Sequence, residues 1–219
     1  MKSTFSLASI ALIMFLSTIG CQANKTKSTT METTMEQSSI QSTYTPPVKT
    51  TDKKYPRYQV DVKQGDVALG SIVLELFTDI APKHCANFDS LVSVKFFDGI
   101  QFHRVIPGFM IQGGDPNTKD LSKRDRWGVG DPSQKNVPAE FNKITHSRGI
   151  LSAARKGNDI NSATSQFFLV VANSSFLDEQ YTVYGQAVSG MEVADKVVST
   201  ERDGKDCPLK PITMTVKKL

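Results

Sequence analysis

One arginine stands among apolar neighbours in residues 102–115, which read FHRVIPGFMIQGGD. If the Pro-Gly dipeptide inside this segment joins two strands, alternate residues share one face. Arg104, Phe109, Met110 and Gln112 would then line a concave apolar site that holds a cation and an amide. The chemistry of such a site is electrostatic, because a guanidinium stays charged and presents its donors in a rigid fork. The alternative is a salt-bridged arginine on an ordinary strand.

The sequence lacks the motifs of several other chemistries. It contains no GxGxxG or GxxxxGK[ST] phosphate loop and no GxSxG nucleophile elbow. Its histidines, His84, His103 and His146, have no metal-ligand spacing with one another or with a cysteine. We therefore expect neither a metal nor a cofactor.

The three cysteines cannot form a disulfide framework. Cys85 neighbours the apolar side of an expected helix, which favours a buried, inert thiol. Cys207 precedes Pro208 in a polar loop, and a Cys85–Cys207 disulfide stays open because the sequence does not supply the distance.

Many short strands and two helices are expected to position these residues. Residues 58–63 and 67–77 alternate apolar and polar side chains around a Gly-Asp turn, which predicts a strand pair. A helix should follow, capped by Asp79 and with Pro82 in its first turn. Further strands are expected over 101–106, 109–112, 150–153, 166–171, 182–187 and 212–216, and a second helix over 193–198. This pattern indicates a closed barrel or a sandwich without separating the two.

The segment over residues 102–115 resembles the signature of the cyclophilin family of peptidyl-prolyl isomerases. Five further segments are similar to family motifs and follow in the same order: AEF at 139–141, GILSAA at 149–154, SQFF at 165–168, FLD at 176–178 and VYG at 183–185. Together they span about residues 58–219. The resemblance implies a mainly β fold, an eight-stranded closed antiparallel barrel capped by two α-helices, and peptidyl-prolyl cis-trans isomerase activity.

The resemblance also implies a role for individual residues. Arg104 matches the catalytic arginine, which would stabilise the proline nitrogen as it becomes pyramidal in the twisted transition state. Gln112 would bond the substrate backbone and orient Arg104, and His103 precedes the arginine as in the family. The backbone of residues 154–156 would pair with the residues before proline. The implied substrate-binding residues are Phe109, Met110, Ala154, Arg155, Lys156, Gln166, Phe168, Phe176, Leu177 and Tyr181.

The chain departs from the common family pattern at several positions. Phe176 replaces a Trp associated with tight cyclosporin binding, so we expect weakened inhibition. Tyr181 replaces a His at the edge of the pocket. Residues 115–134 differ from the usual loop and carry the only tryptophan, Trp127, and residues 156–161 form a slightly longer loop. Both loops either alter substrate choice or are solvated connections.

Residues 1–20 have the pattern of a secretory signal peptide. Lys2 is their only charge, and the apolar run over 5–16 is too short to span a bilayer. STIGC at 17–21 resembles a bacterial lipobox, although Thr18 stands where Leu is usual. The resemblance implies cleavage before Cys21 and its lipidation; the alternative is an ordinary signal peptide with a chance cysteine. Gln22, rather than Asp, after the cysteine implies the outer membrane, with the protein facing the periplasm.

Residues 21–56 are rich in Ser and Thr and poor in large apolar side chains, which predicts a flexible tether. The alternative is a weak helix over 30–40. We expect the isomerase domain to occupy 57–219. A formal net charge of +4 is too small to imply a nucleic-acid partner.

These features predict an isomerase for proline-containing polypeptides, unfolded or exported, which is monomeric and meets the membrane only through its lipid anchor. Two alternatives stay open. The domain could bind proline segments without turnover, or the loop around Trp127 could dock a partner protein.

Overall fold

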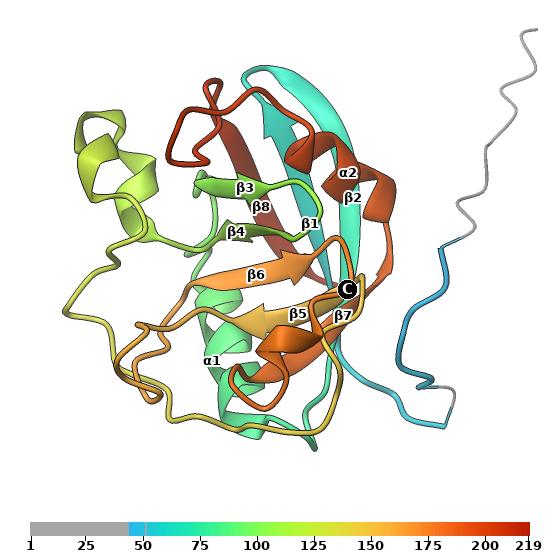
Figure 1. Cartoon of the computed structure of the whole chain (residues 1–219). Helices are drawn as coiled ribbons and strands as arrows, with labels where there is room; N and C mark the ends of the chain where they lie inside the picture. The colour runs from blue at the N-terminus through green and yellow to red at the C-terminus, as the bar shows by residue number, and fades with distance from the viewer. Residues whose placement is uncertain (1–43, 51) are drawn as a thin grey trace, which may run out of the picture. The chain divides into compact units, whose positions relative to one another are not determined.

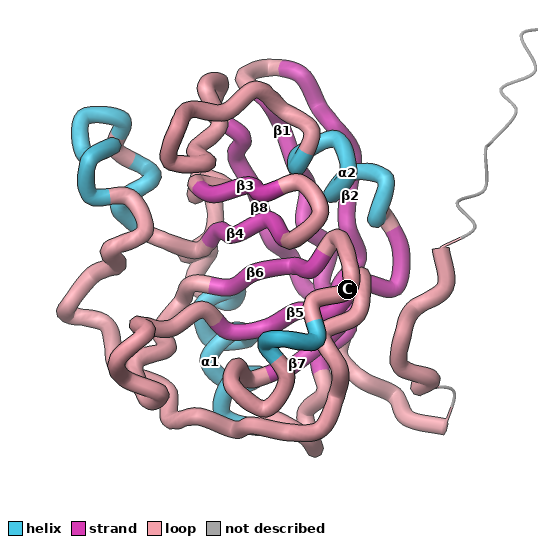
Figure 2. Tube along the Cα trace, in the orientation of Figure 1, coloured by secondary structure: helices cyan, strands magenta, loops and turns pink. Residues whose placement is uncertain are grey.

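The computed structural model describes residues 44–50 and 52–219. Eight antiparallel strands form one sheet in the order β3-β4-β6-β5-β7-β2-β1-β8. The strands are β1 (Arg57–Gln64), β2 (Val67–Leu76), β3 (Arg104–Ile106), β4 (Met110–Gly113), β5 (Ile150–Ala153), β6 (Phe167–Val170), β7 (Val183–Ser189) and β8 (Ile212–Lys218). The helices are α1 (Pro82–Ser93) and α2 (Met191–Val198), with three short 3-10 helices η1 (Pro116–Lys119), η2 (Leu121–Arg126) and η3 (Ser175–Leu177). The expected mainly β fold with two α-helices is confirmed (Figures 1 and 2).

The sheet curls around an apolar core into a half-barrel, and the expected closure is not confirmed. β3 and β8 end the strand order and do not pair with each other. The residues just before β3 contact β8 through the isolated bridge Gln101–Thr213 and a hydrogen bond from the Gly99 N–H to the Met214 carbonyl (3.0 Å). β3 is shorter than the expected strand over 101–106. The free edge of β3 meets a loop, where the Val105 N–H donates to the Asp206 carbonyl (2.8 Å). The half-barrel therefore stays open between β3 and β8.

The alternation in the sequence explains which strand faces are buried. In β1 the side chains of Tyr58, Val60 and Val62 are buried, while their neighbours are exposed or half-buried. This two-residue period is that of a strand with one face on the core. The sequence therefore predicts the inner face of β1 correctly.

Helix α1 begins at Pro82 as expected, but Asp79 does not cap it. The backbone N–H groups of Lys83 and His84 donate instead to the two carboxylate oxygens of Glu140, each at 3.0 Å. A carboxylate at the first turn also interacts favourably with the positive end of the helix dipole. The cap thus comes from a residue that is distant in the sequence.

Residues before β1 lie against the domain where the structure describes them. Val48 exchanges two backbone hydrogen bonds with the Gln186 side-chain amide, both at 2.9 Å. The Thr50 hydroxyl donates to the Glu75 carboxylate (2.7 Å), and the Tyr55 hydroxyl bonds Asp79. The last part of the expected tether therefore has specific contacts.

The other expectations for the N-terminal part stay predictions. Cys21, the signal peptide over 1–20 and the alternative helix over 30–40 lie outside the described residues, and the domain boundaries are untested. None of the described helices is both long and apolar enough to span a membrane.

Candidate active site

The β3–β4 hairpin places Arg104 and Gln112 opposite each other. The two residues are partners across the strand pair, and Ile106 pairs with Met110 at the turn end. Gly108 has a φ of 73°, which suits glycine in this tight turn. Arg104 is exposed, and its side chain forms no ion pair or hydrogen bond within the described part of the chain. The ordinary salt-bridged arginine is therefore not observed.

An apolar floor lies beside this arginine. Met110, Phe168 and Leu177 are buried in one cluster, against which Phe109 and Tyr181 pack. Strand register brings Phe168 of β6 opposite Gln112 of β4. The structure thus brings together four of the residues implied to bind substrate, Phe109, Met110, Phe168 and Leu177.

The edge of this floor is aromatic. The ring of Tyr181 meets that of Phe168 edge-on, with centroids 5.7 Å apart. Phe176 in η3 is 65% exposed, and its ring lies 5.3 Å from that of Phe109. Phe176 therefore covers the rim of the pocket, rather than its floor.

A buried histidine, His146, packs against the apolar floor. The His146 ring stacks on Phe168, with centroids 6.0 Å apart and an interplanar angle of 18°. Its Nδ1 lies 2.9 Å from an Asp178 carboxylate oxygen, and its Nε2 lies 3.1 Å from Ser152 Oγ. Burial lowers the pKa of His146, which keeps the ring neutral near pH 7. Ser152 and Asp178 stand in two recognised motifs, but only the fold joins them to the histidine.

Gln112 does not contact Arg104 in the way the resemblance implied. Its amide Nε2 donates to Gln166 Oε1 (3.1 Å), and Gln166 Nε2 donates to the Gly128 carbonyl (3.2 Å). The two glutamines therefore form a series of hydrogen bonds that runs from β4 to the loop at Gly128. Gln166, predicted to bind substrate, is in this structure the acceptor that holds Gln112.

The segment 154–156 is partly occupied by hydrogen bonds of its own. The Ala154 N–H donates to the Gln166 carbonyl (3.0 Å), and the Lys156 N–H donates to Ser162 Oγ (2.8 Å). Within the described residues, the Arg155 N–H and the Ala154 carbonyl have no such partner. These two groups are the ones that a peptide strand can pair with.

His103 lies beside the arginine but is not a second cation. Its side chain is buried, and neither ring nitrogen has a hydrogen-bond partner among the described residues. Burial lowers the pKa of His103 to about 4, although the nearby Asp115 carboxylate acts in the opposite direction. The ring is therefore neutral near pH 7.

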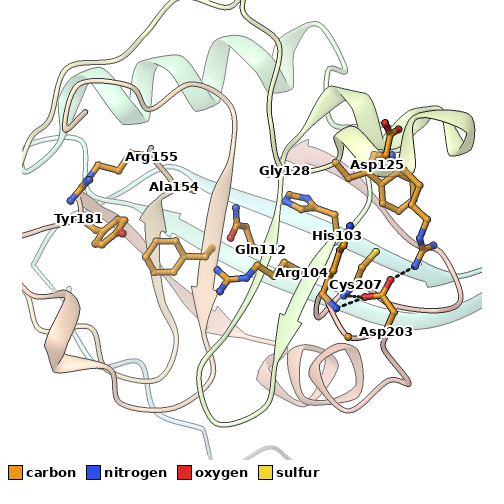
Figure 3. A pocket seen from close by; sticks show the side chains of 15 residues that line it. His103, Arg104, Gln112, Asp125, Gly128, Ala154, Arg155, Tyr181, Asp203 and Cys207 are labelled. Carbon is orange, nitrogen blue, oxygen red and sulfur yellow. Dashed lines mark hydrogen bonds and ion pairs between the residues drawn. The ribbon is translucent and has the colours of Figure 1, made fainter. Parts of the chain in front are cut away.

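A cavity of about 1010 Å³ extends to both sides of Arg104. Figure 3 shows Arg104 and Gln112 at its centre, between Tyr181 and Arg155 on one side and Asp203 and Cys207 on the other. The second side was not predicted, because residues 203–207 match no motif. These residues lie beside β3 only because the fold brings them there.

The loop around Trp127 forms a wall of this cavity. The buried Asp115 carboxylate accepts hydrogen bonds from the backbone N–H groups of Asn117, Gly128 and Gly130. The Arg124 guanidinium lies 5.2 Å from the Trp127 ring centroid and donates to Asp203 (3.2 Å). The loop is therefore anchored by specific contacts, which argues against a merely solvated connection.

Both described cysteines are free and buried, so the alternative of a Cys85–Cys207 disulfide is not observed. Burial raises the pKa of Cys85 to about 12, which makes it unreactive, as expected. Cys207 lines the cavity, and burial raises its pKa as well.

Comparison with known proteins gives consistent results. The model of the family "Cyclophilin type peptidyl-prolyl cis-trans isomerase/CLD" matches residues 59–218. A probable peptidyl-prolyl cis-trans isomerase of Brucella suis is 42% identical over 153 residues, which cover 68% of this chain and 76% of the relative. The isomerase ppi1 of Schizosaccharomyces pombe is 38% identical over 145 residues, covering 66% of this chain and 90% of the relative.

Solved structures agree. A cyclophilin type isomerase of Cryptosporidium parvum superposes with a TM-score of 0.67 at 26% identity, covering 76% of this chain and 98% of that chain. A second structure of that protein, in the presence of the dipeptide Ala-Pro, gives a TM-score of 0.63 at 26% identity, covering 73% and 96%. With a family model that matches most of the chain, this protein belongs to the cyclophilin family of peptidyl-prolyl cis-trans isomerases.

Proposed function

We propose that this protein accelerates rotation about X-Pro peptide bonds and that Arg104 stabilises the twisted amide. The observation that carries the proposal is an unpaired guanidinium beside the apolar floor of Met110, Phe168 and Leu177. The floor suits a proline ring, and the exposed cation beside it would be within reach of the nitrogen of a proline bound there.

The physical basis is the electronic change during rotation. Resonance across the C–N bond sets a barrier of roughly 18–20 kcal/mol. When the amide twists, the nitrogen becomes pyramidal and regains a lone pair. A guanidinium therefore interacts more strongly with the twisted transition state than with the planar ground state. No nucleophile, base or metal takes part in this reaction.

The remaining site residues would fix one side of the bond while the other turns. A peptide strand can pair with the Arg155 N–H and the Ala154 carbonyl, and Gln112 can bond the backbone nearer the proline. The C. parvum relative determined in the presence of Ala-Pro supports a proline-containing ligand for this site.

The central experiment is turnover of an X-Pro test peptide by the full chain, with Arg104→Ala and Arg202→Ala compared. Arg202 is a matched control because it is an exposed arginine, paired with Asp206, that does not line the cavity around Arg104. We expect Arg104→Ala to lower kcat/KM about 100-fold or more, as for loss of one oriented donor, and Arg202→Ala to have no effect. Equal turnover by the wild type and Arg104→Ala would refute the arginine mechanism.

The same proteins distinguish the binding-module alternative. If no variant accelerates the exchange while calorimetry shows that the wild type binds the peptide, the domain holds proline segments without turnover. Circular dichroism of each variant checks that the fold is retained.

We further propose that the chain is anchored through a lipid on Cys21 and assists the folding of exported proteins, as a monomer, at the periplasmic face of the outer membrane. The lipobox-like segment and the Ser/Thr-rich tether support this location. Cys21→Ser should abolish incorporation of labelled fatty acid and release the protein from the membrane fraction. Membrane association that persists in this variant would refute the anchor.

A further inference from the structure

We propose that the groove on both sides of Arg104 selects proline-containing segments that carry an acidic side chain two positions before the proline. This inference rests on the proposed function and names its preferred substrate class. It follows from the charges that line two adjoining cavities and from the partners that these charges lack.

The first observation is the density of basic side chains. A second cavity, of about 430 Å³, shares Gln112, Gly128, Ala154 and Arg155 with the first, so the two form one continuous groove. The basic residues that line the groove are Arg104, Arg124, Arg126, Arg155, Lys156 and Lys205. A polypeptide that crosses Arg104 therefore meets positive charge on both sides.

The second observation is that five of these six cations have no carboxylate partner within the described residues. Of the six, only Arg124 forms an ion pair within the described residues, with Asp203. The Arg155 guanidinium is held by the carbonyls of Gln180, Lys156 and Gly157, which leaves its charge uncompensated. Outside the groove, seven other Lys or Arg side chains have carboxylate partners. Five of the six groove cations thus lack a carboxylate partner, against ten of the seventeen Lys and Arg side chains that are described elsewhere.

The acidic residues of the groove do not balance it. Asp203 is bonded to Arg124 and to the N–H groups of Lys205 and Cys207. The Asp131 carboxylate accepts hydrogen bonds from the Ser133 N–H and hydroxyl. Asp125 is the third acidic residue that lines the groove. Since His103 is neutral, six cations face three carboxylates, and an acidic ligand meets a complementary surface.

The position of the two cavities predicts which substrate residues are selected. The second cavity contains Arg126 and Lys156 and adjoins the segment 154–156, which is proposed to pair with residues before the proline. An acidic residue two positions before the proline should therefore be favoured through Arg126. Lys205 lies in the other arm of the groove, beyond Arg104.

The test compares kcat/KM for the peptides acetyl-X-Ala-Pro-Phe-p-nitroanilide with X as Glu, Gln or Lys, using the full chain in a protease-coupled assay. Exposed charge pairs have modest effects, so we expect the Glu peptide to exceed the Lys peptide by about five-fold at low salt. The ratio should approach one at about 1 M salt, where the Debye length is ~3 Å.

Two charge reversals locate the effect. Arg126→Glu should abolish or invert the Glu-to-Lys ratio. Lys143→Glu makes the same change at an exposed lysine that lines neither cavity, and it should leave the ratio as in the wild type. Turnover of the neutral Gln peptide shows that each variant is folded.

Each outcome is decisive. Equal acceleration of all three peptides would overturn the charge selection while the proposed isomerase function stands. A preference that survives Arg126→Glu would show that this arm of the groove does not read the charge. If the wild type accelerates none of the peptides, it is the proposed function that fails, and the selection fails with it.

Discussion

Arg104 and Gln112 are direct partners across β3 and β4, yet within the described residues the Arg104 guanidinium donates no hydrogen bond to Gln112, whose amide donates to Gln166. Gln166 is held in turn by the Gly128 carbonyl. The amide is thereby fixed across the groove, while the guanidinium stays free for a substrate.

Loss of the Gln166 side chain should lower catalytic activity without abolishing it. A net hydrogen bond is worth ~1 kcal/mol, so Gln166→Ala should lower kcat/KM about five-fold, much less than Arg104→Ala. Gln166→Glu retains the acceptor for Gln112 but loses the donor to the Gly128 carbonyl, so its kcat/KM should lie between those of Gln166→Ala and the wild type. Gln59→Ala, at a half-buried glutamine on β1, serves as control. Wild-type turnover by Gln166→Ala would show that the relay is dispensable.

Stability should fall in mild acid because of His103. Burial lowers its pKa to about 4, so below pH ~6.5 the unfolded chain binds a proton that the folded domain does not. The free energy of unfolding then decreases as the pH falls from ~6.5 toward 4, by about 2 kcal/mol at pH ~5 from this residue. The lowered pKa values of His84 and His146 act in the same direction.

Urea denaturation at about pH 7.5 and about pH 5 measures this effect. His103→Gln is neutral at both values, so its stability should fall by about 2 kcal/mol less than that of the wild type. An equal fall in both proteins would mean that His103 takes up its proton without unfolding.

The segment before β1 should contribute to stability. Gln186 is 0% and Glu75 is 1% exposed, and they bond Val48 and Thr50. A chain that begins at Arg57 leaves these buried groups short of partners, which should cost about 2 kcal/mol relative to a chain that begins at Tyr44. Urea denaturation of the two chains gives the difference.

A control separates these contacts from chain length. Lys49→Ala changes an exposed residue of the same segment and should leave the longer chain unaffected. If both chains unfold at the same urea concentration with the same slope, the contacts of Val48 and Thr50 add nothing.

Phe176 is expected to weaken cyclosporin binding, because the resemblance places a tryptophan there in relatives that bind it tightly. Phe176→Trp adds an indole N–H donor at the exposed rim, and one hydrogen bond of ~1 kcal/mol should tighten binding about five-fold. Calorimetric titration measures the change. Phe141→Trp, at another exposed phenylalanine, should have no effect; unchanged affinity in Phe176→Trp would place the cause elsewhere.

The sequence by itself determined the parts of this protein that are encoded in short segments. Alternation predicts the inner face of β1, and Pro82 marks the start of α1. The motif around Arg104 predicts the family, and together with the SQFF and FLD segments it predicts the residues of the apolar floor. These features depend on neighbours within a few positions, so a local pattern is enough to find them.

Only the tertiary structure decided the features that join distant residues. Glu140 caps α1 in place of Asp79, Gln186 holds Val48, and residues 203–207 complete the cavity beside Arg104. A capping carboxylate, a buried amide or a polar loop has no period that reveals its partner. Their pairing depends on how the sheet curls and where it stays open, because buried polar groups must find hydrogen-bond partners wherever the fold brings them.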